Sequence, residues 1–182
     1  MKFLPVLGVL LVATASASAE PDSPKFSVGG GAEIGAIARE MEYRGRGMEY
    51  GGLTLEGSYR LSKRPLFARA QIARGIGFGD GSYSHDYLQG RVGLEYRQRL
   101  GVDWLHAYGG VDLGVVRLDE MDEMTQRVYE TDAALLVVPR AGIQIGNRLY
   151  GRLGAEVPLY VLLTNPGNEL GFAFTATFGA SF

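Results

Sequence analysis

The stretch that decides the fold runs from Phe172 to Phe182 and reads FAFTATFGASF. Every second residue is apolar, and the residues between them are small or hydroxylic. A period of two predicts a β-strand with one apolar and one polar face. In a soluble protein this strand would leave an apolar edge open to association. In a membrane, an all-strand protein must close on itself because hydrocarbon offers the backbone no partners, so the last strand should pair with the first.

The beginning of the chain has the pattern of a secretory signal. Residues 1–19 contain one cation, Lys2, then an apolar run from Phe3 to Ala13, and end in Ala17-Ser18-Ala19. The apolar core is too short for a membrane span, which disfavours the alternative of an anchoring helix. We expect cleavage after residue 19, a short periplasmic leader over residues 20–25, and one barrel domain over residues 26–182.

Composition excludes several classes of protein. The chain has no cysteine, so an exported product cannot be held together by disulfides. No run of eighteen apolar residues is present, so no transmembrane helix is expected. Removal of Lys2 with the signal would change the formal net charge from −2 to −3, which argues against a nucleic-acid partner.

Alternation of apolar and polar residues continues along the whole expected domain. It predicts eight strands, over residues 26–38, 53–61, 66–72, 88–96, 105–115, 135–145, 150–161 and 172–182. Four longer loops are predicted at residues 40–52, 79–86, 117–132 and 165–169, and three short turns lie at the other ends of the strands. Long loops outside and short turns in the periplasm are typical of outer-membrane barrels, so both termini should be periplasmic.

Some residues do not fit the simple pattern. The phase of the third strand places Arg74 on the lipid face, which predicts a position at the outer rim or a bulge at Gly75. Pro139 cannot donate to a strand ladder and should mark a bulge or a weak point. Aromatic residues near strand ends predict two belts at the membrane surfaces: Tyr59, Tyr96, Trp104 and Tyr150 by the turns, and Tyr50, Phe78, Tyr83 and Tyr87 by the loops.

The polar face of the strands carries balanced charge. An eight-stranded barrel is just wide enough for its own side chains to fill. Because buried charges must be paired, five acids facing five bases predict a plugged lumen with a charge network. Its expected members are Glu33, Glu56, Glu95, Asp112 and Glu156 with Arg60, Arg69, Arg91, Arg140 and Arg152.

A three-residue turn at 147–149 would fix the register of strands six and seven. Gly146 would then face Tyr150, and paired residue numbers would add to 296. Arg140 would oppose Glu156 on the inward face, where opposed Cβ atoms lie about 5 Å apart. The register therefore predicts a salt bridge between these two side chains.

The aromatic strand that ends in Phe182 resembles the closing strand of bacterial outer-membrane β-barrels, and the whole pattern resembles the small OmpA/OmpX-like family. The resemblance implies an all-β, eight-stranded, antiparallel up-and-down transmembrane barrel. It also implies contact with outer-membrane lipid and lipopolysaccharide, and a monomeric state. Phe172, Phe174, Phe178 and Phe182 are similar to the signal that the barrel-assembly machinery reads. The alternative fold is a soluble, lipocalin-like barrel with its apolar face inward.

Three functions are compatible with this pattern. The first is a non-enzymatic surface protein that supports envelope integrity or adhesion through its loops; the others are a narrow solute or ion channel and a lipid A-modifying enzyme. His85 and His106 lack the arrangement of an activated nucleophile, so no catalytic residue is expected. The acidic run after Arg117 lacks calcium-loop spacing, so we expect no metal and no cofactor.

Overall fold

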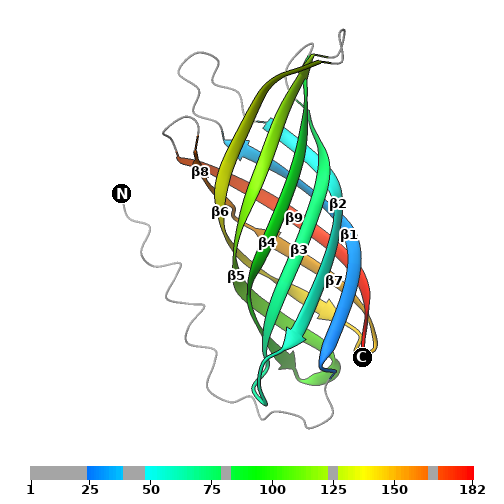
Figure 1. Cartoon of the computed structure of the whole chain (residues 1–182). Helices are drawn as coiled ribbons and strands as arrows, with labels where there is room; N and C mark the ends of the chain where they lie inside the picture. Colours follow the sequence, from blue (N-terminus) through cyan, green and yellow to red (C-terminus); the bar gives the residue numbers. More distant parts are fainter. Residues whose placement is uncertain (1–23, 39–47, 79–82, 123–126, 164–167) are drawn as a thin grey trace.

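The structure, a computed structural model, describes residues 24–38, 48–78, 83–122, 127–163 and 168–182 (Figure 1). Regular structure in these residues is entirely β-strand. The strands are β1 (Phe26–Ala38), β2 (Met48–Arg60), β3 (Leu66–Phe78), β4 (Tyr83–Leu100), β5 (Val102–Asp122), β6 (Arg127–Ile145), β7 (Leu149–Glu156), β8 (Leu159–Leu162) and β9 (Asn168–Ser181). The predicted signal, residues 1–19, lies outside the described residues.

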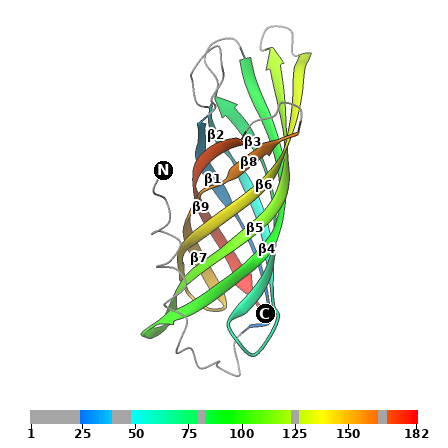
Figure 2. The same ribbon diagram turned by 90° about the vertical axis from the view of Figure 1, so that its left-hand side faces the viewer.

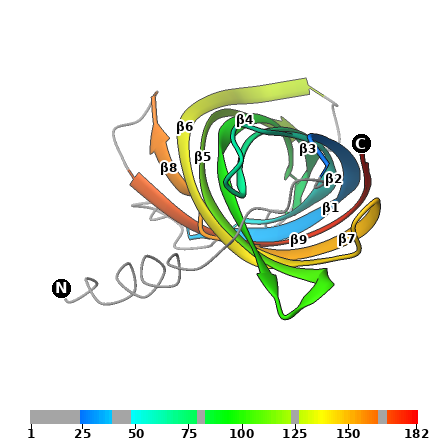
Figure 3. The ribbon, with the colours of Figure 1, turned by 90° about the horizontal axis from the view of Figure 1, so that it is seen from below.

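The strands form one closed antiparallel barrel. β1 to β7 pair in the order of the chain, and both β7 and β8 lie between β6 and β9. β1 also pairs with β9, from Ser27 opposite Ser181 to Ala38 opposite Leu170. Seen along its axis, the sheet curls into a ring (Figure 3). The predicted closure of the first strand on the last is therefore confirmed, and the backbone has no open edge at this seam.

β7 and β8 are two halves of one barrel strand. Residue numbers paired with β6 add to 296 both at Arg140 opposite Glu156 and at Val137 opposite Leu159, so the register continues across the gap. The Val157 N–H donates to the Pro139 carbonyl at 3.0 Å, but proline has no N–H to return. The predicted weak point at Pro139 is confirmed, and the barrel has eight strands around its circumference.

Several strands are longer than the alternation predicted. β5 continues to Asp122 and β6 already begins at Arg127, whereas a loop was expected over residues 117–132. The charged side chains suggested a loop, but ladder hydrogen bonds join backbone groups and tolerate polar side chains. Asp119 opposes Thr131 and accepts hydrogen bonds from that hydroxyl at 2.7 Å and from Arg117 at 2.9 Å. β4 to β6 therefore rise above the other strands at the loop end (Figure 2).

The apolar face points outward. Phe174, Phe178, Leu94, Val111, Leu153 and Ile143 were all predicted to face lipid, and their exposed fractions lie between 39% and 76%. The buried charged side chains point inward instead, so the lipocalin-like alternative is wrong. Within the described residues, no helix is long and apolar enough to cross a membrane.

Arg74 also lies on the outward face, with a side chain that is 75% exposed. The pairing of β2 with β3 continues without interruption through Arg74 and Gly75, so the predicted bulge at Gly75 is absent. Arg74 makes an ion pair with Asp86 at 3.1 Å.

Gly31 and Gly30 test the closure seam as a matched pair. A Cβ added at Gly31 would lie 2.0 Å from the Ala176 carbonyl oxygen of β9, whereas one at Gly30 would meet nothing closer than 3.7 Å. Overpacking of this kind costs about 1–3 kcal/mol. We expect Gly31→Ala to lower the free energy of unfolding by that amount and Gly30→Ala to have little effect. Urea unfolding in lipid vesicles, followed by fluorescence of Trp104, measures both; equal stabilities would contradict the seam geometry.

Candidate functional site in the barrel lumen

Alternation along every strand sends a set of charged side chains into the lumen. We call this set the charge layer; it consists of Glu33, Glu56, Glu95, Asp112 and Glu156 with Arg69, Arg91, Arg97, Arg140 and Arg152. All ten are buried. They form a continuous series of contacts along the barrel axis, described below from the end with the short turns to the end with the loops.

At the turn end, the contacts centre on Glu95, which is completely buried. Its carboxylate accepts a hydrogen bond from the Arg97 Nε and another from the Arg140 Nη2 at 2.6 Å. The Arg152 Nη2 lies 3.4 Å from the same carboxylate. Arg97 in turn donates to the Ser58 hydroxyl at 2.5 Å. One carboxylate thus holds three guanidinium groups from three different strands.

The middle of the charge layer centres on Arg69. Its Nη2 donates to Glu56 Oε2 at 2.6 Å, and its Nη1 donates to Asp112 Oδ2 at 2.5 Å. The other oxygen of Glu56 accepts from Arg152 Nη1 at 3.0 Å. These contacts join residues far apart in the sequence, because the narrow lumen places opposite walls within reach of an arginine side chain.

Toward the loop end, Arg91 and Glu33 carry the network. Arg91 Nη1 donates to Glu156 Oε2 at 2.5 Å, and Arg91 Nη2 lies 3.6 Å from Glu33 Oε2. The other oxygen of Glu33 accepts hydrogen bonds from the Tyr87 hydroxyl at 2.8 Å and from the Gln89 side-chain amide at 2.5 Å. The buried charge of Arg91 is therefore compensated by Glu156 and Glu33, and the buried charge of Glu33 is compensated by Arg91.

An apolar layer fills the lumen above the charge layer, at the loop end. It consists of Ile37, Tyr50, Ala73, Tyr87, Val116, Leu118, Ala134, Leu136, Val138, Tyr160 and Ala173, all buried. The rings of Tyr50 and Tyr87 pack edge to face, with their centroids 5.1 Å apart. A single inward face therefore contains two chemically different layers.

The predicted aromatic belts need correction. Tyr50, Tyr87 and Tyr150 are buried inside the barrel and do not face the membrane surfaces. Tyr59 and Trp104, by contrast, lie on the outside near the turns and are about half exposed. The error arose because position near a strand end does not say which face a residue occupies, whereas the parity of its position in the strand does.

The predicted salt bridge between Arg140 and Glu156 was wrong. Arg140 does oppose Glu156 in the predicted register, yet its guanidinium binds Glu95 and Asp112, while Glu156 binds Arg91. Register fixes Cβ positions only, and long side chains reached carboxylates across the lumen instead. Arg60, another expected member of the network, is half-buried at the turn end, where it donates to the Lys63 carbonyl at 2.8 Å.

Two inward residues of the network, Arg97 and Gln71, were absent from its expected members, although the alternation already placed both on the inward face. Arg97 lies two residues from Glu95 on the same face of β4. Its guanidinium also stacks 3.8 Å over the centroid of the Phe67 ring. Gln71 accepts from Arg69 at 2.5 Å and from Arg91 at 2.6 Å, so a neutral amide links two parts of the network.

His106 is half-buried on β5, and the side chain of His85 lies outside what the structure describes. Among the described residues, no three histidine, aspartate or glutamate side chains gather as metal ligands would. The four phenylalanines of the expected assembly signal, Phe172, Phe174, Phe178 and Phe182, all project outward from the last strand and its end.

Comparison with known proteins identifies the fold. No protein-family model and no curated protein matches the chain. Among solved structures, Neisserial surface protein A (NspA) is 11% identical over 86% of this chain and 97% of its own, with a TM-score of 0.72. Ail, the attachment invasion locus protein of Yersinia pestis, is 14% identical over 88% of this chain and 99% of its own, with a TM-score of 0.58.

OprG, an outer membrane protein of Pseudomonas aeruginosa, is 13% identical over 88% of this chain and 96% of its own, with a TM-score of 0.59. At such identities the likeness concerns the path of the backbone. The chain therefore has the fold of the small eight-stranded outer-membrane β-barrels, the OmpA- and OmpX-like architecture that its alternating strands predict.

Proposed function

We propose that this protein is an integral outer-membrane barrel without enzymatic activity, whose lumen is plugged and whose loop end acts at the cell surface in adhesion or envelope integrity. The observation that carries this proposal is the filling of the lumen by two layers of side chains. The cavity enclosed by Ile37, Tyr50, Tyr87 and their neighbours has a volume of only about 10 Å³. One water molecule needs at least that much, and so small a void supports a lumen that is closed to solutes at this level.

The shape of the outside supports the surface role. The polar ends of β4, β5 and β6 extend past the apolar band at the loop end, where a partner can reach them. With the loops outside, both termini and the short turns lie in the periplasm, and the last strand is available to the assembly machinery during insertion. Ail, named for attachment and invasion, shares this fold. We propose a monomer, since the barrel closes within one chain.

Two measurements on the same protein test the functional assignment. In planar bilayers the reconstituted barrel should show no discrete single-channel openings, because the two layers block the lumen. Lipid A extracted from cells with and without the protein should have the same acyl pattern by mass spectrometry. Discrete openings would establish a channel instead, and an altered acyl pattern would establish a lipid A-modifying enzyme. Cells that lack the protein should adhere less or become more sensitive to detergent.

The plug should also carry much of the stability of the barrel. Glu95→Gln keeps the size of the side chain but removes the charge that compensates three buried guanidinium groups. Loss of one partner of a buried ion pair costs about 3–5 kcal/mol. We expect a decrease of that order in the free energy of unfolding in vesicles.

The matched control is Asp103→Asn, which breaks an exposed pair with Arg99 at 2.5 Å. Exposed pairs of this kind often contribute nothing measurable. If Glu95→Gln and Asp103→Asn changed the free energy of unfolding equally, the lumen charges would not stabilise the barrel. The stability of the filled lumen would then come from the apolar layer alone.

A further inference from the structure

Arg74 stands out on the outward face of β3. Its neighbours on this face along the strand are Ile72 and Ile76, and its partners across the ladder are Leu53 on β2 and Leu88 on β4. A cation among lipid-facing apolar side chains is costly at mid-bilayer and becomes acceptable near the interface. Its presence therefore calls for an anionic partner at the height of the lipid headgroups.

The Arg74 side chain leans toward the loop end. Its partner Asp86 opposes Ile76 and not Arg74 itself, so the contact runs diagonally, one outward position closer to the loops. This is the direction that a long cationic side chain takes to bring its charge to the interface. Only the Nη2 engages Asp86. A guanidinium has five N–H donors, so it can bind a second anion alongside the carboxylate.

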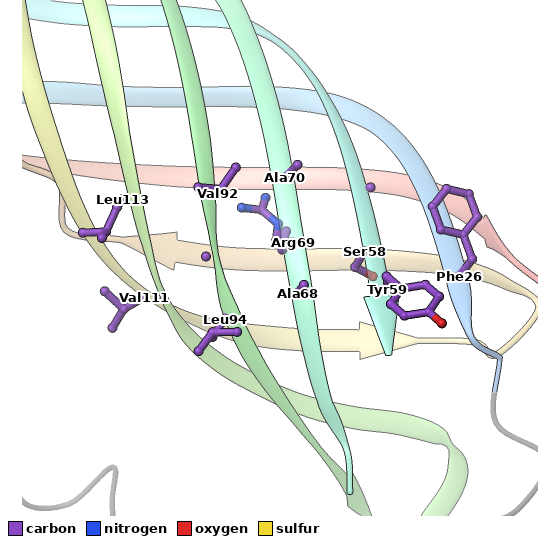
Figure 4. Close-up of a pocket in the computed structure, with 12 residues that line it drawn as sticks. Phe26, Ser58, Tyr59, Ala68, Arg69, Ala70, Val92, Leu94, Val111 and Leu113 are labelled. Atoms are coloured by element: carbon purple, nitrogen blue, oxygen red, sulfur yellow. The ribbon is translucent and has the colours of Figure 1, made fainter. Parts of the chain in front are cut away.

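A groove on the outer surface lies below Arg74, toward the turn end. Its volume is about 790 Å³, and it crosses the outer face from Phe26 and Tyr59 to Val111 and Leu113 (Figure 4). Ala68 and Ala70 lie in the middle of the groove on β3, between these larger side chains. Small residues on one strand, flanked by bulky ones on its neighbours, form an apolar channel that an acyl chain can occupy.

The cation and the groove are aligned on the same face of the same strand. Ala70 is four residues from Arg74, which corresponds to about 13 Å along the strand. One leaflet of the hydrocarbon core is about 15 Å thick. A lipid with its phosphate at Arg74 would therefore place its acyl chain along Ile72 and into the groove at Ala70.

We propose that Arg74 and this groove form a binding site for lipid A, the lipid part of lipopolysaccharide. The guanidinium binds a lipid A phosphate, and the groove holds one acyl chain. The assignment rests on the proposed function, since a barrel with its loops outside has lipopolysaccharide in the leaflet at the loop end. Asp86 shares the guanidinium with the phosphate, so its charge opposes binding.

Lipid retention by the full-length barrel tests the site. The barrel is reconstituted in phosphatidylcholine bilayers that contain lipid A, transferred to detergent, and analysed for bound lipid A by native mass spectrometry. One interfacial arginine contributes about a fivefold change in binding of an anionic lipid, so Arg74→Gln should reduce retention by about that factor. Ala70→Phe should reduce it too, by filling the groove. Asp86→Asn should increase it, because the competing carboxylate is gone.

Two controls separate this site from general contact with lipid. Ala141→Phe places the same ring on the outward face of β6, away from the groove. Ala141 lies opposite Gly109 and Ala155, just as Ala70 lies opposite Gly57 and Val92. Arg148→Gln removes an exposed arginine from a turn at the opposite end. Neither should change retention. Phosphatidylglycerol replaces lipid A in a parallel series, and equal retention would show a general preference for phospholipid phosphate.

Three outcomes would overturn the site: no effect of Arg74→Gln, an equal loss from Ala141→Phe and Ala70→Phe, or a loss of retention in Asp86→Asn. These failures differ from failure of the proposed function. If the wild-type barrel inserts into bilayers but shows no preference for lipid A over phosphatidylglycerol, only the lipid site is wrong. If the chain does not insert as a closed barrel, the proposed function itself is wrong.

Discussion

The structure depends on one constraint, the need of every backbone N–H and C=O for a partner where no water is present. An open sheet would leave two rows of these groups in hydrocarbon, so the pairing of β1 with β9 is the contact on which the remaining structure rests. This pairing continues to Phe182. The N–H groups of Lys25 and Phe26 both donate to the Phe182 carbonyl, at 2.8 and 3.1 Å. Phe182 returns a bond to the Phe26 carbonyl at 2.8 Å.

Closure at eight strands determines what the inside can be. The lumen is narrow enough for arginines on one wall to reach carboxylates on another, and this is why contacts link positions as distant as Arg152 and Glu56. A charged inward face also specifies register. Because the side-chain period is two, a slip of one strand by one residue would move the lumen charges of that strand into lipid and its apolar side chains into the lumen. The charge layer therefore selects one pairing of the strands as well as filling the space.

β3 shows how one strand serves the two environments. Arg69 and Gln71 point into the lumen, where Gln71 accepts a hydrogen bond from Arg69 of the charge layer. Ala68, Ala70 and Arg74 alternate with them on the outside. Each outward position has a different chemical role, since small residues leave room for an acyl chain and the cation requires an anion near the interface. The inward side of the strand thus joins the charge network, and its outward side carries the residues of the proposed lipid site.

Much of this protein was determined by sequence alone, because a period of two reports directly on the two faces of a strand. That period predicted the barrel, the closure of Phe26–Ala38 on the last strand, the lipid-facing residues and the register of Arg140 opposite Glu156. Only the tertiary structure decided which lumen charges bind each other. Arg140 binds Glu95 and Asp112, because its flexible side chain can cross the narrow lumen. Alternation along one strand does not predict which residues lie on the opposite wall. The apolar layer, the inward tyrosines, the polar extensions of β5 and β6, and the alignment of Arg74 with the groove likewise depend on how strands lie beside one another in space.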